Sequence, residues 1–228
     1  MKKTFAALAL ATALVPFSSA QADVISYTAS KAMTTTNWSD ALSFNKFDSS
    51  LGTLTSIKFA LTGVVQGTGE AESRDAAASV VTLTLGSLLG LTRPDGSTLV
   101  VTNPVFSQEF NFTAYDGLPD FGGTSGGTTG LVEAIGSNSF TSLLASDFAL
   151  FTGVGGDLIS LGLNAVGNST GVGAGNLQTF FSTAASGSAV VTYEYTPFAE
   201  VPEPASLALI AGGLGLLGLS RRRIGGKA

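Results

Sequence analysis

The chain of 228 residues contains no cysteine and no histidine. These two absences exclude disulfide bonds, nucleophile systems of the Ser-His-Asp and Cys-His types, and zinc sites with histidine or cysteine ligands. The phosphate-binding pattern Gly-x-x-x-x-Gly-Lys-Ser/Thr is also absent. We therefore predict no catalytic residues and no cofactor, and we expect a protein that is not an enzyme.

Charged residues are scarce, at 12% of the chain. Between Asp23 and Glu200, 15 Asp or Glu residues stand against 5 Lys or Arg residues, so this part has a formal charge of −10. An acidic surface repels the phosphates of nucleic acids, and it does not attract anionic polysaccharides by charge. We therefore predict no nucleic-acid partner.

The N-terminus carries two lysines, an apolar run from Phe5 to Val15, and then Ala20-Gln21-Ala22. This order is typical of a secretory signal peptide, and the apolar run is too short for an ordinary transmembrane helix. We predict a signal peptide over residues 1–22, with Ala20 and Ala22 as the small residues that direct its cleavage.

Residues 23–197 alternate apolar and polar side chains over many short stretches. The apolar residues fall at every second position, which places them on one face of a β-strand. The clearest stretches are residues 56–62, 81–85, 106–111, 159–165, 177–181 and 191–196. Turn signals such as Arg93-Pro94-Asp95-Gly96 separate them. We predict an all-β fold, an antiparallel β-sandwich or jelly-roll-like domain over 23–197 with about nine or ten short strands.

Residues 147–151 read Asp-Phe-Ala-Leu-Phe and leave two interpretations open. They form either one helical turn or the start of another strand, because a short apolar run alone does not separate the two.

Two aspartates, Asp116 and Asp120, lie four positions apart in a glycine-rich stretch. Aspartate is common in turns, so we interpret both as turn-forming residues and predict no metal site. Calcium is the alternative, since it prefers oxygen ligands on loops, although the EF-hand pattern is absent. A glycosidase would need two carboxylates across a cleft. The candidates for such a carboxylate pair are these two aspartates together with Glu109 and Glu133. We expect all four side chains to be solvated, which is the usual state of surface carboxylates.

A second acidic group surrounds Arg74 and contains Glu70, Glu72 and Asp75. We interpret this group as a solvated loop, because charged residues are almost never fully buried unless they are paired.

The chain has a single tryptophan, Trp38, near Leu42 and Phe44. An exposed indole is a common platform for sugar binding. A tryptophan beside other apolar residues more often packs in a core or at its edge, which is the interpretation that we prefer.

The C-terminal residues have three parts in a fixed order: Val201-Pro202-Glu203-Pro204, an uncharged run from Ala205 to Ser220, and three arginines. The prolines keep the first part extended. The uncharged run of 16 residues reaches about 24 Å as a helix, which is short for a bilayer core of about 30 Å. The arginines should remain in the cytoplasm. We predict a linker at 198–204, a short transmembrane helix at 205–220 and a basic cytoplasmic tail at 221–228.

This C-terminal order resembles the PEP-CTERM sorting signal. The resemblance implies that the chain is a substrate of an exosortase, a membrane-embedded transpeptidase-like enzyme of Gram-negative bacteria, which removes the tail near the Pro-Glu-Pro motif. It further implies delivery to the cell surface or the exopolysaccharide matrix. The residues implied in recognition are Val201, Pro202, Glu203 and Pro204, and those implied as the membrane stop are Arg221, Arg222 and Arg223.

The exported part resembles the choice-of-anchor E domain. The matching segments are Trp38–Ser56, Asp116–Gly126 and Val190–Tyr195. The resemblance covers roughly residues 25–196 and implies export. No activity is established for that family, so the resemblance implies no reaction.

Three functional hypotheses follow from these patterns. The preferred one is a non-enzymatic protein of the cell surface or matrix, processed at its tail. The second is a carbohydrate-binding module, specific for exopolysaccharide, that is exported by the same route and uses a sheet face or loop aromatics. The third is a hydrolase, which the missing histidines disfavour.

Overall fold

The computed structural model describes residues 22–198. The segments 1–21 and 199–228, which contain most of the predicted signal peptide and the predicted transmembrane helix, lie outside the described residues. Within the described part, no helix is long and apolar enough to cross a membrane. Residues 22–196 pack as one unit, which we call the β domain.

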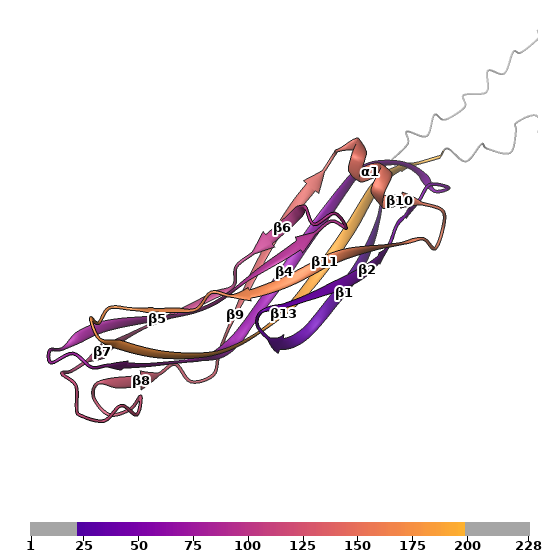
Figure 1. The fold of residues 1–228 in the computed structure, drawn as a ribbon. Helices are drawn as coiled ribbons and strands as arrows, with labels where there is room; N and C mark the ends of the chain where they lie inside the picture. Colours follow the sequence, from indigo (N-terminus) through magenta and orange to yellow (C-terminus); the bar gives the residue numbers. More distant parts are fainter. Residues whose placement is uncertain (1–21, 199–228) are drawn as a thin grey trace, which may run out of the picture. The chain divides into compact units, whose positions relative to one another are not determined.

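Antiparallel strands make up nearly all of the β domain, as predicted, with one short helix, α1 (Figure 1). The elements are β1 (Asp23–Thr35), β2 (Trp38–Asn45), β3 (Phe47–Asp48), β4 (Gly52–Ser73), β5 (Ser79–Thr92), β6 (Thr98–Thr102), β7 (Val105–Phe112), β8 (Gly126–Thr128), β9 (Val132–Ser142), α1 (Ala145–Phe151), β10 (Thr152–Gly153), β11 (Leu158–Gly167), β12 (Thr170–Val172) and β13 (Leu177–Pro197). Of the two interpretations of residues 147–151, the helical one is correct.

The prediction of short strands throughout is wrong for the strands at the centre of the sheets. β4 has 22 residues and β13 has 21. Sequence alternation breaks where glycines and threonines interrupt the apolar pattern, but the backbone hydrogen bonds of these strands do not depend on side chains and continue through those positions.

Two sheets form the β domain. In the first, β13 lies between β1 and β4, and the other edge of β4 pairs with β9 and then with β8. In the second, β5 pairs with β6 and β7 along one edge and with β11 and β12 along the other, and β2 pairs with β11. A two-residue parallel pair joins β3 and β10.

Three strands continue through the whole β domain, and the others are interrupted. β4, β5 and β13 are continuous, whereas breaks at 103–104, 129–131 and 168–169 separate β6 from β7, β8 from β9, and β11 from β12. We call the part with β1, β2, β6, β9 and β11 the proximal half, the part with β7, β8 and β12 the distal half, and the breaks between them the junction. The halves follow one another along the continuous strands (Figure 1).

Each half has its own hydrophobic core. The proximal core takes buried side chains from both sheets, including Ile57, Phe59 and Leu61 on β4 and Leu161 and Leu163 on β11. The distal core is smaller and consists of Ala71, Val81, Leu83 and Phe112. Both sets follow the predicted alternation, which is therefore confirmed as a guide to which face is buried.

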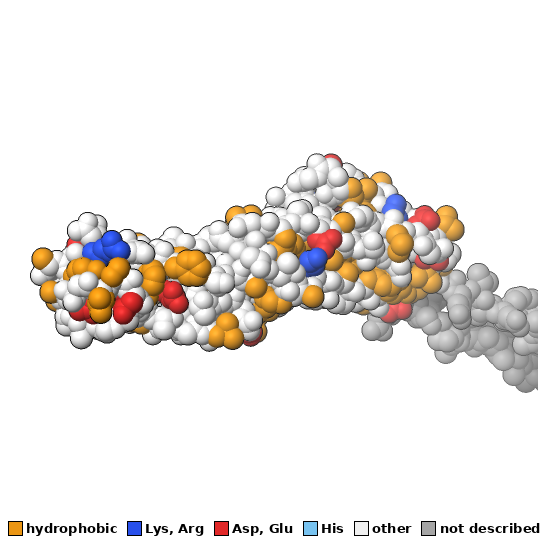
Figure 2. All heavy atoms as spheres, turned by 60° about the horizontal axis from the view of Figure 1, so that its bottom comes forward, with side chains coloured by type: hydrophobic (Ala, Val, Ile, Leu, Met, Phe, Trp, Pro, Cys, Tyr) orange, Lys and Arg blue, Asp and Glu red, His pale blue; other side chains and the backbone are white. Residues whose placement is uncertain are grey.

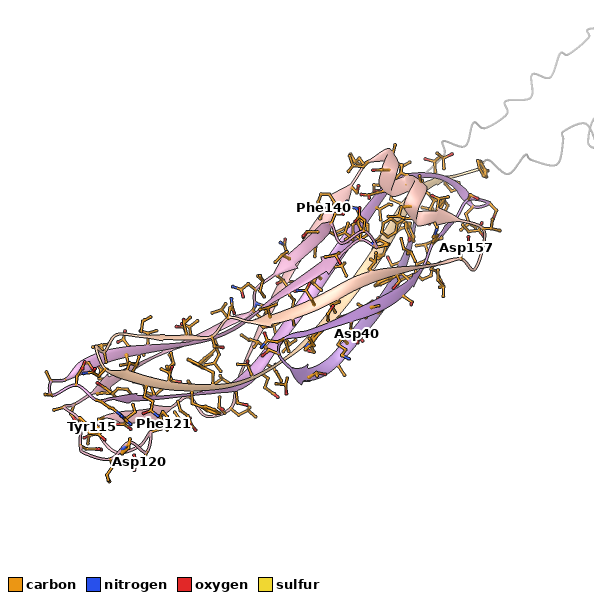
Figure 3. All side chains as sticks on the ribbon, viewed as in Figure 1. Asp40, Tyr115, Asp120, Phe121, Phe140 and Asp157 are labelled. Carbon is orange, nitrogen blue, oxygen red and sulfur yellow. The ribbon has the colours of Figure 1, made fainter. Side chains whose placement is uncertain are left out.

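Side-chain contacts link the edges of the two sheets in the proximal half. On one side, Lys31 of β1 forms an ion pair of 2.7 Å with Asp40 of β2. Figure 3 labels Asp40. On the other side, Asn138 of β9 donates to the carbonyl of Val101 of β6 at 2.8 Å. Charged side chains are few on the face seen in Figure 2. The hydrogen bond from Asn138 satisfies one backbone carbonyl on β6, an edge strand of the second sheet.

Two buried tyrosines hold the C-terminal end of β13 in place. The hydroxyl of Tyr193 donates to the carbonyl of Asn45 at 3.0 Å, and that of Tyr195 donates to the carboxylate of Asp23 at 3.1 Å. Burial raises the pKa of Tyr193 above its ordinary value. Because Asp23 lies opposite Tyr195 in the antiparallel register, β1 begins beside the end of β13.

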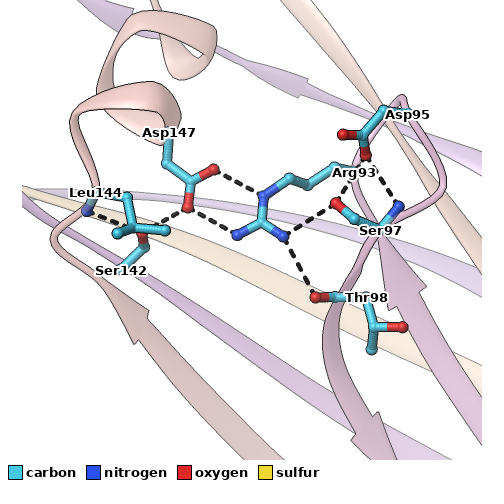
Figure 4. Close-up of polar contacts among 7 residues, drawn as sticks. All are labelled: Arg93, Asp95, Ser97, Thr98, Ser142, Leu144 and Asp147. Atoms are coloured by element: carbon cyan, nitrogen blue, oxygen red, sulfur yellow. Dashed lines mark hydrogen bonds and ion pairs between the residues drawn. The ribbon is translucent and has the colours of Figure 1, made fainter.

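The short helix α1 is tied to the β5–β6 hairpin by an ion pair with little exposed surface (Figure 4). Arg93 donates to both carboxylate oxygens of Asp147, at 2.7 and 2.8 Å, and its other amino group donates to Ser97 and Thr98. Ser142 donates to the same carboxylate. The hydrogen bonds from Arg93 are the first cause that holds the pKa of Asp147 below its ordinary range.

A pocket of about 270 Å³ lies beside this ion pair. Both carboxylate oxygens of Asp147 accept hydrogen bonds from Arg93, and one of them also accepts from Ser142. The carboxylate that faces the pocket is therefore already satisfied. We interpret the network as a structural link that fixes α1.

Glycine at the junction allows a close approach of backbone. A Cβ atom at Gly67 on β4 would lie 2.2 Å from the carbonyl oxygen of Ser182 on β13. A distance under 3.0 Å to a backbone atom forces the strands apart, so a residue with a side chain does not fit without rearrangement.

We predict that Gly67→Ala destabilises the protein by about 2 kcal/mol or more, since the clash involves backbone of a neighbouring strand. Urea unfolding followed by circular dichroism measures the loss. The control is Gly175→Ala, where the new Cβ would meet only the side chain of Asp75 at 3.4 Å or more. Equal stability of the two variants would contradict the steric explanation.

We predict that Asp147→Asn lowers the free energy of unfolding at pH 7 by about 2–3 kcal/mol, because it leaves the little-exposed Arg93 without its anionic partner. The matched control is Asp40→Asn, which breaks the more exposed pair with Lys31 and should cost less. Chemical denaturation of the three proteins compares the two pairs, and a larger loss in Asp40→Asn would refute the assignment.

The stability difference between the native protein and Asp147→Asn should depend on pH. The folded pKa of Asp147 is depressed, so its contribution is complete above the unfolded value of about 4 and is lost as the pH falls toward the folded value. We expect the difference to be constant from pH 7 to 5 and smaller at pH 3. A difference that grows on acidification would contradict the sign of the shift.

Candidate functional site

Two neighbouring pockets lie at the junction, where β1 ends and the distal half begins. The larger, of about 310 Å³, is lined by Thr35, Thr36, Asn37, Gly167, Ser169, Phe181 and Thr183. The smaller, of about 170 Å³, is lined by Thr35, Gln66, Gly67, Thr68, Leu131, Ser182, Thr183 and Ala184. They share Thr35 and Thr183, and we call them the junction pockets.

The tight turn from β1 to β2 builds one wall of the larger pocket. Asn37 has a φ of 71°, a left-handed conformation that asparagine tolerates better than most residues. Its backbone N–H donates to Ala165 at 2.9 Å, and its side-chain oxygen accepts from Gly167 at 3.2 Å. The backbone N–H of Thr36 donates to Thr183 at 3.0 Å. These bonds hold the turn against β11 and β13.

Two lining residues of the larger pocket, Gly167 and Thr36, approach each other closely. A Cβ atom at Gly167 would lie 2.9 Å from the hydroxyl oxygen of Thr36. The hydroxyls of Thr36 and Thr183, which both line this pocket, lie 2.9 Å apart and form a hydrogen bond. The larger pocket therefore combines side chains from β13, the β1–β2 turn and the break after β11, with Gly167 at the end of β11.

No charged side chain lines either junction pocket. The polar groups are the hydroxyls of serine and threonine and the amides of asparagine and glutamine, with Phe181 as the aromatic residue. Such groups both donate and accept hydrogen bonds and suit an uncharged polar ligand. No feature of the sequence indicated this site, because its residues are far apart in the chain.

The predicted turn residues Asp116 and Asp120 lie on the loop between β7 and β8, beside Tyr115 and Phe121 at the distal end (Figure 3). Asp116 accepts from the backbone N–H of Leu118 at 3.0 Å, which is the first cause of its lowered pKa. Asp120 accepts from the N–H of Gly122 at 2.9 Å. Bonds to the residue two positions on are those of turn-forming aspartates.

Within residues 22–198, no three acidic, histidine or cysteine residues are grouped to hold a metal ion. Calcium at Asp116 and Asp120, the alternative to the turn interpretation, would have two carboxylates as its protein side-chain ligands.

The interpretation of the acidic group around Arg74 as a solvated loop is wrong for Glu70 and Glu72, whereas Asp75 does lie on a loop, after β4, and is partly exposed. β4 continues to Ser73, so Glu70 and Glu72 belong to the strand, and Glu72 is fully buried beneath the β7–β8 loop. One of its carboxylate oxygens accepts from the hydroxyl of Ser125 at 2.6 Å, and the other has no hydrogen-bond partner. Asp75 accepts from the N–H groups of Gly175 and Asn176. These carboxylates organise the distal loops.

The structure does not bring Glu109 and Glu133 together. Glu109 is exposed on β7 opposite Thr82 of β5, and Glu133 is exposed on β9, where Gln66 donates to it at 3.5 Å. Neither residue lines the pockets described above.

Trp38 packs against the proximal core and is half-buried, which confirms its interpretation as a residue at the edge of the core. Its indole N–H is buried without a hydrogen-bond partner. The ring therefore does not form an exposed platform.

The predicted sorting residues lie outside the described residues: Val201, Pro202, Glu203, Pro204, Arg221, Arg222, Arg223 and Ala20. Of the predicted cleavage residues, Ala22 is described and is exposed, directly before β1. The structure therefore does not test these positions.

Comparison with solved structures gives only weak likenesses. A structure of infectious bursal disease virus, Gt strain, is 17% identical over 97% of this chain and 53% of that chain, with a TM-score of 0.11. The Gx strain is 14% identical over 87% and 49%, with a TM-score of 0.16. The chain thus spans about half the length of these viral chains. TM-scores this low carry no structural argument.

No curated protein has a significantly similar sequence. The choice-of-anchor E resemblance is not confirmed by the comparisons and stays a prediction.

The family model of the PEP-CTERM protein-sorting motif matches residues 200–224. This range contains the predicted recognition residues Val201–Pro204 and the predicted membrane-stop arginines 221–223. The chain therefore carries a PEP-CTERM sorting motif at residues 200–224, which supports an exported protein of the cell envelope or surface that an exosortase processes.

Proposed function

We propose that this protein is a non-enzymatic component of the cell surface or extracellular matrix, an exported β-sandwich whose tail an exosortase cuts. The observation that supports this proposal most directly is the PEP-CTERM match at residues 200–224. In this proposal, the signal peptide at 1–22 directs export, and the apolar segment at 205–220 holds the chain in the membrane until cleavage near Pro202-Glu203-Pro204.

The register of β1 and β13 fits this route. Because Asp23 pairs with Tyr195, the segment before β1 and the segment after β13 are attached at the same end of the β domain. The tyrosine contacts of β13 keep that strand in its sheet close to the point where the linker starts. A tail attached to a firmly paired strand is a short tether, which suits a substrate that is held at the membrane and then released.

A carbohydrate-binding protein exported by the same route is the second candidate. The observation that favours it is the lining of the junction pockets, which consists of hydroxyl, amide and apolar groups without charge. These groups match the hydroxyls of a polysaccharide better than they match a charged polymer.

Mass spectrometry of the protein from its native host, with and without the host's exosortase, tests the processing. We expect a protein that begins at Asp23 and ends near Pro202–Pro204 in the normal host, and an uncut tail in the exosortase-deficient host. Glu203→Gln should retain the tail in the normal host, whereas the control Glu109→Gln, at an exposed position on β7 outside the matched motif, should be processed. An intact tail in both hosts would refute processing by exosortase and leave a simply anchored β domain.

A further inference from the structure

The junction pockets lie where a neighbouring strand is missing. The pairing of β1 with β13 ends at Thr35 and Ala184, so β1 does not cover β13 from Thr183 back to Leu177. Both pockets open at this point, one on each side of Thr183. A ligand here meets the side chains and the edge of a firmly held strand, which is a more precise support than a loop.

The lining limits the class of ligand. Ionic ligands are normally held by side chains of opposite charge, and none lines these pockets. Hydroxyl and amide groups such as those of Ser169, Gln66 and Thr68 exchange hydrogen bonds with groups that also donate and accept. The hydroxyls of a neutral sugar meet this requirement. The larger pocket, of about 310 Å³, lies at the small end of the usual range for ligand pockets, about 300–1,000 Å³.

An aromatic ring lines the larger pocket, and a second one lies on the strand that passes the smaller pocket. Phe181 lines the larger one. Phe180 is 56% exposed, and it shares a face of β13 with Ser182 and Ala184, which line the smaller one, because alternate residues of a strand point to the same side. An aromatic face packs against the apolar face of a sugar ring while neighbouring polar groups bind its hydroxyls. The larger pocket thus has both kinds of group in its lining, and its aromatic ring, Phe181, also packs against the distal core.

We propose that the junction pockets bind a short segment of an uncharged polysaccharide, which spans both pockets across Thr35 and Thr183. This proposal rests on the second candidate function and specifies its site and ligand class. The binding is reversible and involves no covalent step. It predicts preference for neutral over anionic glycans, in keeping with the formal charge of −10 on the exported part.

Isothermal titration of the full-length protein, in a detergent without sugar groups, tests the proposal. The neutral probes are cellohexaose, maltohexaose and laminarihexaose, and the anionic probe is hexagalacturonate. We expect at least one neutral hexasaccharide to bind, and hexagalacturonate to bind at least tenfold more weakly. Absence of heat with all three neutral probes, or preference for the anionic one, would overturn the proposal.

Variants that fill the pockets locate the binding. Thr35 lines both pockets and is exposed, so Thr35→Trp should weaken binding of the neutral hexasaccharide at least tenfold. Ser182→Trp fills the smaller pocket from another strand and should also weaken it, which guards against a folding defect in one variant. The matched control is Thr28→Trp, an exposed threonine on β1 away from the pockets. Unchanged affinity in both pocket variants would place any binding elsewhere.

The same variants separate this proposal from the processing hypothesis. Normal removal of the tail with no sugar binding would refute only the binding site. Sugar binding by a protein whose tail is never cut would refute only the processing.

Discussion

β13 runs between β1 and β4, and hydrogen bonds to both neighbours hold its proximal part at the centre of its sheet. Tyr193 and Tyr195 add side-chain bonds at its end. The arrangement of the domain depends on this strand, because it contributes to both cores and carries the chain toward the sorting motif. A strand paired on both edges is far harder to open than a terminal segment on the surface.

Burial of apolar side chains is the main source of stability in a domain with so few charges. Within residues 22–198 two ion pairs are present, and the Arg93–Asp147 pair is the less exposed of them. A pair of this kind adds little to the free energy of unfolding relative to an apolar contact of the same size. It does specify where the two elements meet, because removing one partner leaves the other charge without a counter-charge. Here it fixes α1 against the β5–β6 hairpin, a place where the apolar pattern alone leaves helix and strand open.

The division into two halves explains where a binding site is available. In the proximal half, β1 and β2 complete the two sheets, and side-chain contacts join the sheet edges. In the distal half those strands are absent, and buried polar groups such as Glu72 and Ser125 take part in closing the end. The junction between the halves is the place where strands stop and glycines allow close approach, so concave surface forms there. A neutral pocket at such a place is compatible with the sorting route, since it lies away from the end where β13 meets the linker.

The sequence alone determined the fold class, the buried faces and the sorting motif. Alternation placed Ile57, Phe59 and Leu61 on one face because side chains of a strand alternate strictly, and the sorting motif is contiguous, so both are local properties. Tertiary structure decided the rest. Glu72 is buried because distant loops cover the end of β4, Arg93 meets an aspartate 54 positions away, and the junction pockets combine residues from positions 35 to 184. Such contacts depend on strand order and register, which pairing energies over the whole sheet select and no short stretch of sequence encodes.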